Sequence, residues 1–195
     1  MKYLKMLGLA AIAAAALMVI AGPASATTLT SPANTKLGVG AEIKASTPAG
    51  THAVLDSPIG KIECNGSVAG KITNAGGGTP TVSVEGSLST LSFTGCTTAT
   101  VHVLKNGTLK ITSSGGGKGA LVSNGAEVTV ETFGLHCIYA TSNTAIGTVT
   151  GGSPATLAIS ATIPRTGGKS GAFCGSTAPW TGSYTVTSPN PLLVD

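Results

Sequence analysis

Hydrophobic and polar positions alternate along much of the chain with a period of two, the pattern of strands that bury one face. The clearest run has apolar residues at Leu157, Ile159, Ala161 and Ile163. Glycine, proline and Asn-Gly pairs separate roughly 12 to 14 such runs, and no amphipathic helical stretch follows the N-terminal segment. The pattern predicts an all-β fold: an antiparallel β-sandwich of the Ig-like or jelly-roll-like kind, or else a barrel.

The parity of the alternation changes once within a predicted strand. Apolar residues of the run 82–88 lie on one face, whereas Leu91 and Phe93 have the opposite parity. A shift of one residue moves side chains to the other face of a sheet. We therefore predict a bulge or a tight turn at Ser89-Thr90.

Asn106-Gly107 predicts a hairpin, and the hydrophobic pattern selects its loop. A three-residue loop over 105–107 pairs Val103 with Leu109, which places apolar residues on one face and His102 on the solvent face. A two-residue loop would put His102 among the apolar residues. We therefore expect the longer loop, with Gly107 in a left-handed conformation.

Two parts of the chain share one plan, residues 54–113 and residues 128–188. Each contains a cysteine, a glycine-rich turn, a strand-like run and a second cysteine, in that order. The glycine-rich turns are Gly76-Gly77-Gly78 and Gly151-Gly152. We interpret the two parts as degenerate repeats of one β-unit.

The four cysteines are Cys64, Cys96, Cys137 and Cys174. An even number in an exported protein indicates disulfides, and four cysteines allow three pairings. If the repeats are real, equivalent cysteines pair in the same way, which favours Cys64–Cys96 and Cys137–Cys174. Zinc is the rival interpretation, but there is no C-x-x-C and the three histidines lack the short spacings of zinc ligands.

The N-terminus has the layout of a signal peptide. Lys2 and Lys5 precede an apolar run over 6–20, and the small-residue motif Ala24-Ser25-Ala26 follows. We predict cleavage after residue 26, with an uncleaved anchor as the alternative. No later stretch is apolar for the length that a membrane span needs. The expected location is secreted, either extracellular or on the cell surface.

Cleavage of 26 residues from 195 leaves 169, enough for one domain with its own core. We expect an extended, poorly ordered lead-in at 27–35 and a single domain at 36–195. Loss of the signal peptide reduces the basic residues from 11 to nine, against seven acidic ones. These basic residues are scattered, which argues against nucleic acid as a partner. The low charge and the abundance of Thr and Ser predict a neutral, hydroxyl-rich surface.

Candidate catalytic residues are few. The chain has no G-x-S-x-G motif, and His52 with Asp56 is its closest histidine–acid pair. On one strand these two side chains would lie about 13 Å apart. Glu127 and Glu131 could form a carboxylate pair, but ordinary sheet charges explain them better. We predict a protein that is not an enzyme and has no metal or cofactor, with an unrecognised hydrolase site as an alternative.

Trp180 and Tyr184 are the candidate ligand platform. They lie an even number of residues apart, so they share one face of a strand. Such a pair could bind a carbohydrate or an apolar small molecule. The alternative is a structural role in which Trp180 packs over the Cys137–Cys174 disulfide.

The C-terminal segment from Cys174 to Leu192 contains the pattern Trp-x-x-x-Tyr-x-Val-x-Ser-Pro-x-Pro-Leu. This ending resembles that of small exported bacterial four-cysteine all-β proteins, most of them uncharacterised. More distantly, the four-cysteine, Thr- and Gly-rich plan is similar to the Pra type of secreted adhesive proteins, which are linked to the biofilm matrix and to growth on alkanes. The resemblance implies a surface role without enzymatic activity and assigns no functional residues.

Together these observations predict an exported cell-surface or extracellular-matrix protein with an adhesive or structural role. Its expected partners are a surface glycan or another matrix protein, and its sheet edges could mediate self-association. The first alternative is a secreted binding module for a carbohydrate or an apolar small molecule. The second is a secreted hydrolase.

Overall fold

The computed structural model describes residues 26–58, 60–78, 83–168 and 173–195. Within these ranges the chain consists of antiparallel strands and one short 3₁₀ helix, so the all-β prediction is confirmed. Apart from Ala26, the predicted signal peptide lies outside the described residues.

Most strands belong to one closed ring. Its members are β3 (Glu42–Ser46), β4 (Ala53–Ser57), β5 (Gly60–Ala75), β6 (Val84–Thr94), β8 (Thr108–Gly115), β9 (Lys118–Asn124), β12 (Thr144–Thr150), β13 (Thr156–Gly167) and β14 (Thr177–Ser188). Neighbours pair in the order β5-β6-β8-β9-β12-β13-β14. β3 and β4 each pair with both β14 and β5, one at either end of these strands. Together they fill the eighth place in the ring, which closes an eight-strand barrel. The expected sandwich is therefore wrong, because the sheet closes on itself and its ring has no free edge.

Bulges bend the long strands of this ring. In β6, Ala69 pairs with Thr90 and Gly70 pairs with Leu88, so Ser89 is an extra residue and the predicted bulge is confirmed. A second shift lies between Ala145 and Gly147 in β12. Bulges increase the local twist and bend of a strand, which favours closure of the sheet.

Three further strands extend the ring at one end: β7 (Thr100–Lys105), β10 (Glu127–Thr132) and β11 (Leu135–Ala140). β7 pairs with β10, and β8 pairs with β9, so β7 and β8 do not form the predicted hairpin. The two strands follow one another end to end through Asn106-Gly107. Gly107 has a positive φ, as predicted, of 75°, and it bends the chain without reversing it. His102 is exposed as predicted.

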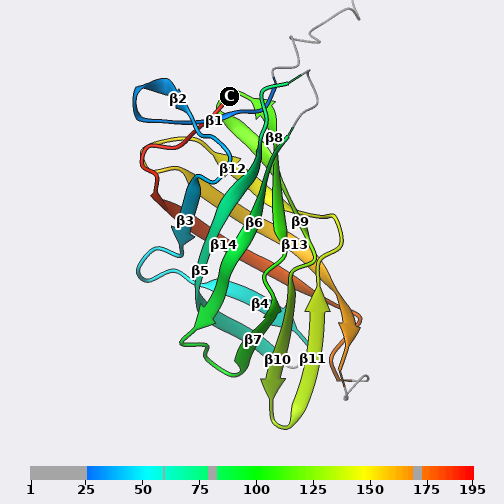
Figure 1. Ribbon diagram of the computed structural model, residues 1–195. Helices are drawn as coiled ribbons and strands as arrows, with labels where there is room; N and C mark the ends of the chain where they lie inside the picture. The colour runs from blue at the N-terminus through cyan, green and yellow to red at the C-terminus, as the bar shows by residue number, and fades with distance from the viewer. Residues whose placement is uncertain (1–25, 59, 79–82, 169–172) are drawn as a thin grey trace, which may run out of the picture.

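The first described strand and the C-terminus meet at the opposite end of the barrel (Figure 1). Here β1 (Leu29–Ser31), the 3₁₀ helix η1 (Pro32–Asn34), β2 (Thr35–Lys36) and β15 (Leu193–Val194) form a small sheet with the order β15-β1-β2. Leu29 and Val194 are buried and pair with each other. Residues 27–35 are thus not a loose lead-in, because the C-terminal strand provides the hydrogen-bond partners of β1.

Two disulfides pair the cysteines as the repeat interpretation predicted. Cys64 on β5 is bonded to Cys96, which follows β6. Cys137 on β11 is bonded to Cys174, which precedes β14. Each disulfide therefore joins a strand to a loop that is distant in the sequence.

Candidate ligand-binding cavity

The barrel encloses two apolar cavities, because alternate residues of its strands point inward. On β13, Ile159 and Ile163 are buried while their neighbours in sequence are more exposed, as the alternation predicted. The first cavity, of about 100 Å³, lies toward β7, β10 and β11. The second, of about 80 Å³, lies toward the termini, where Leu29 and Leu192 line it. Five residues line both cavities: Val68, Leu88, Leu109, Leu121 and Leu157.

The described wall of the first cavity contains no charged side chain. In the second cavity, the charged residues of the described wall are Lys71 and Glu85, both at exposed positions. An ionised ligand group inside the first cavity would therefore lack a counter-charge.

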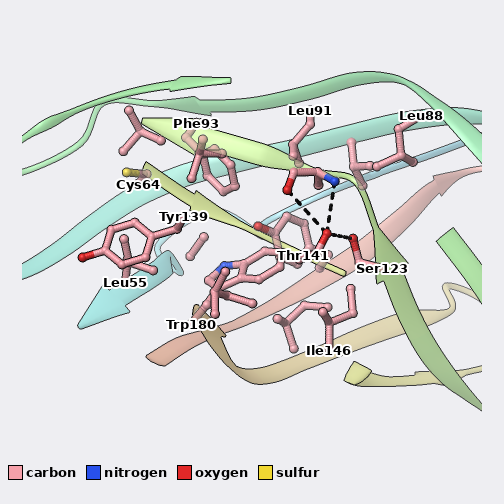
Figure 2. A pocket seen from close by; sticks show the side chains of 18 of the residues that line it. Leu55, Cys64, Leu88, Leu91, Phe93, Ser123, Tyr139, Thr141, Ile146 and Trp180 are labelled. Carbon is pink, nitrogen blue, oxygen red and sulfur yellow. Dashed lines mark hydrogen bonds between the residues drawn. The ribbon is translucent and has the colours of Figure 1, made fainter. Parts of the chain in front are cut away.

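Aromatic side chains concentrate at the first cavity (Figure 2). The rings of Phe93 and Trp180 meet edge to face, with centroids 6.2 Å apart and an interplanar angle of 78°. Trp180 and Tyr184 share the inward face of β14, so the structure brings the predicted pair together in the barrel interior. Tyr184 is only 3% exposed, which rules out an open surface platform at this residue.

Trp180 and Tyr184 each hold a buried polar atom without a hydrogen-bond partner. These atoms are the Trp180 indole Nε1 and the Tyr184 hydroxyl Oη. Burial raises the pKa of the Tyr184 hydroxyl, and the Trp180 indole N–H, which approaches the hydroxyl oxygen, lowers it by a smaller amount. The two groups lie close together, but their geometry does not qualify as a hydrogen bond. The hydroxyl therefore stays protonated at neutral pH and can donate a hydrogen bond.

Other polar side chains of the same wall are already paired. The hydroxyls of Ser123 and Thr141 lie 2.9 Å apart, and the backbone N–H of Ala126 donates to Thr141 Oγ1 at 3.1 Å (Figure 2). The hydroxyl of Tyr139 donates to the backbone carbonyl of Cys174. Since buried polar groups are normally paired, the two unpartnered atoms of Trp180 and Tyr184 stand out from their surroundings.

Each disulfide has one cysteine near this aromatic group. Cys64 lines the first cavity, whereas Tyr139 contacts the loop that holds Cys174. The described ring contact of Trp180 is with Phe93. No described contact joins Trp180 to the Cys137–Cys174 disulfide.

The other sequence candidates lie on the outer surface. His52 precedes β4 and Asp56 lies on it, and both are exposed. On β5, Glu63 lies near His52 and Lys61 lies near Asp56. No described interaction joins His52 to Asp56 itself.

The two acidic residues of β10 have separate side-chain partners. Glu127 lies 2.9 Å from the ammonium of Lys105. Glu131 lies 3.1 Å from His136 and 3.8 Å from His102. These pairs are ordinary cross-strand contacts of exposed or half-buried side chains.

Among the described residues, no group of three or more His, Cys, Asp and Glu side chains could hold a metal ion. The same part of the chain has no helix with the length and apolar character needed to cross a membrane.

Sequence reasoning found Trp180 and Tyr184 but missed that they face an internal cavity. Even spacing places two side chains on one face of a strand, whichever way that face points. Phe93 and Tyr139, the other aromatic residues of the wall, gave no functional signal of their own.

The fold and the cavity together define an all-β protein with a closed antiparallel barrel and an apolar interior. Comparisons with protein-family models, with curated proteins and with solved structures find no match to this chain.

Proposed function

We propose that the protein is exported, is not an enzyme, and binds a small apolar molecule inside its barrel. One observation carries this proposal: an uncharged cavity whose wall holds two buried polar atoms without partners. Eight-stranded barrels either fill their interior with side chains or hold one small ligand, and this interior leaves space. The two disulfides suggest a location outside the cytoplasm, in agreement with the predicted signal peptide.

The test is a titration of the disulfide-intact protein, without its signal peptide, with toluene as a small apolar probe. Trp180 is the sole tryptophan of the chain, so one indole N–H resonance in a ¹H–¹⁵N spectrum reports on the cavity. We expect this resonance to shift and to saturate. An unchanged resonance throughout the titration would contradict the proposal.

A matched pair of variants on β5 locates the binding site. Val68 lines both cavities, so Val68→Phe is expected to fill the space and to abolish the shift. The neighbouring Ser67 is exposed, and Ser67→Phe is expected to bind toluene as the wild type does. Far-ultraviolet circular dichroism checks that both variants are folded.

An adhesive role on the cell surface or in the matrix is a second candidate, favoured by the tip of the β10–β11 hairpin. Phe133 at this tip is 91% exposed, and Phe173 is 65% exposed. The hairpin projects at the end of the molecule opposite β1 and the C-terminus (Figure 1). If this tip is adhesive, Phe133→Ser should reduce retention of the protein on an octyl-substituted resin without changing its affinity for toluene.

A further inference from the structure

We infer that the ligand is an uncharged molecule with one carbonyl oxygen, which accepts hydrogen bonds from Trp180 Nε1 and Tyr184 Oη. This inference rests on the proposed function and specifies its ligand class. The two donors are buried in the wall of the same cavity, four residues apart on the inward face of β14. The Trp180 indole is close enough to the Tyr184 hydroxyl to influence it, so one ligand oxygen can reach both donors.

The two groups differ in what they can offer a ligand. An indole N–H is a donor and nothing else, whereas a phenol hydroxyl donates one hydrogen bond and can also accept. Ser123, Thr141 and Tyr139 already have partners. Among the described residues of the wall, the Trp180 N–H and the Tyr184 O–H therefore remain to donate.

A carbonyl oxygen matches these donors better than a hydroxyl does. It has two lone pairs and no hydrogen, so it can accept from Trp180 and Tyr184 together and leaves no donor unpaired. An alcohol that donated its own hydrogen to Tyr184 would leave the tyrosine hydrogen without an acceptor. A sugar would bring many hydroxyls into a wall with two free polar atoms, and unpaired buried hydroxyls are unfavourable.

The composition of the cavity wall excludes a charged ligand. The described lining of the first cavity has no cation to balance a carboxylate, and Lys71 of the second cavity is at an exposed position. A buried carboxylate without a counter-charge loses its hydration and gains no compensating interaction. A neutral ketone, ester or aldehyde avoids this loss.

The size of the cavities limits the apolar part of the ligand. An engineered protein cavity of about 150 Å³ holds benzene. The two cavities here, of about 100 and 80 Å³, share five wall residues along the barrel. A ligand that occupied both would have roughly six to eight carbon atoms and an elongated shape.

The experiment compares three probes of similar length by the indole N–H resonance of Trp180. They are 2-heptanone, heptanoate and 2-methyl-1-heptene, in which a methylene group replaces the carbonyl oxygen of the ketone. We expect the ketone to bind roughly tenfold more tightly than the alkene, as two neutral hydrogen bonds would produce. A downfield shift of the indole proton should accompany ketone binding, and heptanoate should bind most weakly.

Two variants of β14 test which group makes the difference. Tyr184→Phe is expected to lower the ketone affinity roughly threefold to tenfold and to leave the alkene affinity within about twofold. Ser183 is the exposed neighbour of Tyr184, so Ser183→Ala removes a hydroxyl from the outer face and should change neither affinity.

The outcomes separate this inference from the proposed function. Equal binding of the ketone and the alkene, or tightest binding of heptanoate, would overturn the carbonyl inference while the cavity remained a binding site. An equal loss of ketone and alkene affinity in Tyr184→Phe would also overturn it. Failure of all three probes and of toluene to bind would overturn the proposed function itself.

Discussion

Gly66 provides the space that the ring of Tyr184 occupies. A Cβ atom at this position would lie 2.5 Å from Tyr184 Oη and 2.7 Å from Tyr184 Cε1, too close for unchanged packing. The ligand contact proposed for β14 therefore depends on a residue of β5 that has no side chain. A search for polar or aromatic signals in the sequence passes over such a residue.

We predict that Gly66→Ala destabilises the fold by about 1–3 kcal/mol, the usual cost of an added group in a packed interior. It should also lower the affinity for 2-heptanone, because Tyr184 must shift. Gly38→Ala is the matched control, since Gly38 is exposed, has no positive φ and has no atom within 4 Å of an added Cβ. Denaturant unfolding measures both; equal stabilities of the two variants would contradict the prediction.

The buried Tyr184 hydroxyl makes stability depend on alkaline pH. Burial raises its pKa in the folded state, whereas in the unfolded chain the pKa of a tyrosine is about 10. Above that pH the unfolded state binds fewer protons, so the free energy of unfolding falls as the pH rises. The stability that the protonated Tyr184 hydroxyl contributes is fully present below about pH 10. Above about pH 10 the free energy of unfolding falls by about 1.4 kcal/mol per pH unit.

Denaturant unfolding from neutral pH to about pH 11 measures this slope. Tyr184→Phe should remove much of it. Tyr139→Phe reports the contribution of the other buried tyrosine, whose pKa burial also raises. A wild-type stability that did not change over this range would show that neither tyrosine acts in this way.

At the scale of the strands, the sequence predicted which face of a strand a residue occupies better than which strands pair with each other. The change of parity before Leu91 correctly located the bulge at Ser89, and the exposure of His102 was also correct. Both follow from local alternation, which each strand carries in its own sequence. The pairing of β7 with β8 was wrong because a left-handed glycine can bend a chain as well as reverse it, and distant contacts decide between the two.

Asn106 has a different role from the one that its Asn-Gly pair predicted. Its side-chain amide donates to the carbonyl of Ser89 at 3.0 Å, and its side-chain oxygen accepts from the N–H of Leu91 at 3.2 Å. These contacts satisfy one backbone group of the bulged residue and one of a residue that follows it. Asn106 thereby ties the bend between β7 and β8 to β6.

We predict that Asn106→Ala destabilises the fold by about 1–3 kcal/mol, because it removes two hydrogen bonds to the backbone, of which the one from the Leu91 N–H is partly buried. Asn65→Ala is a suitable control, since Asn65 is exposed on the same barrel and has no described hydrogen bond. Native-state hydrogen exchange should also show faster exchange at the Leu91 amide in Asn106→Ala. Unchanged protection of that amide would argue against the role of Asn106 at the bulge.

At the scale of the whole molecule, closure of the barrel depends on pairs that are far apart in the sequence. Val186 pairs with Ala45 and Trp180 pairs with Leu55, so β14 completes the ring with β3 and β4. Local alternation carries no information about such pairs, and the cavity is the space that remains after all inward side chains are placed. The sequence could therefore predict the inward residues but not the volume between them.

The strand order also bears on the repeat hypothesis. The triplets β5-β6-β8 and β12-β13-β14 come from the two proposed repeats and occupy opposite parts of the ring. The registers of the two triplets differ. In the first, Val84 of β6 pairs with Ile111 of β8, whereas in the second, Ile159 of β13 pairs with Gly182 of β14. The duplication therefore stays a prediction, supported by the equivalent positions of the triplets and by the two disulfides.

The terminal sheet, β15-β1-β2, joins the first described strands to the last strand, and it borders the second cavity. Leu192 is 1% exposed and lines that cavity, whereas the adjacent Leu193 is partly exposed. We predict that Leu192→Ala costs about 2–5 kcal/mol in the free energy of unfolding and that Leu193→Ala costs less. The missing side chain also lengthens the space inside the barrel, so Leu192→Ala should bind 2-nonanone more tightly relative to 2-heptanone than the wild type does. If the two leucine variants unfold alike and prefer the same ketone as the wild type, the terminal sheet does not limit the length of the site.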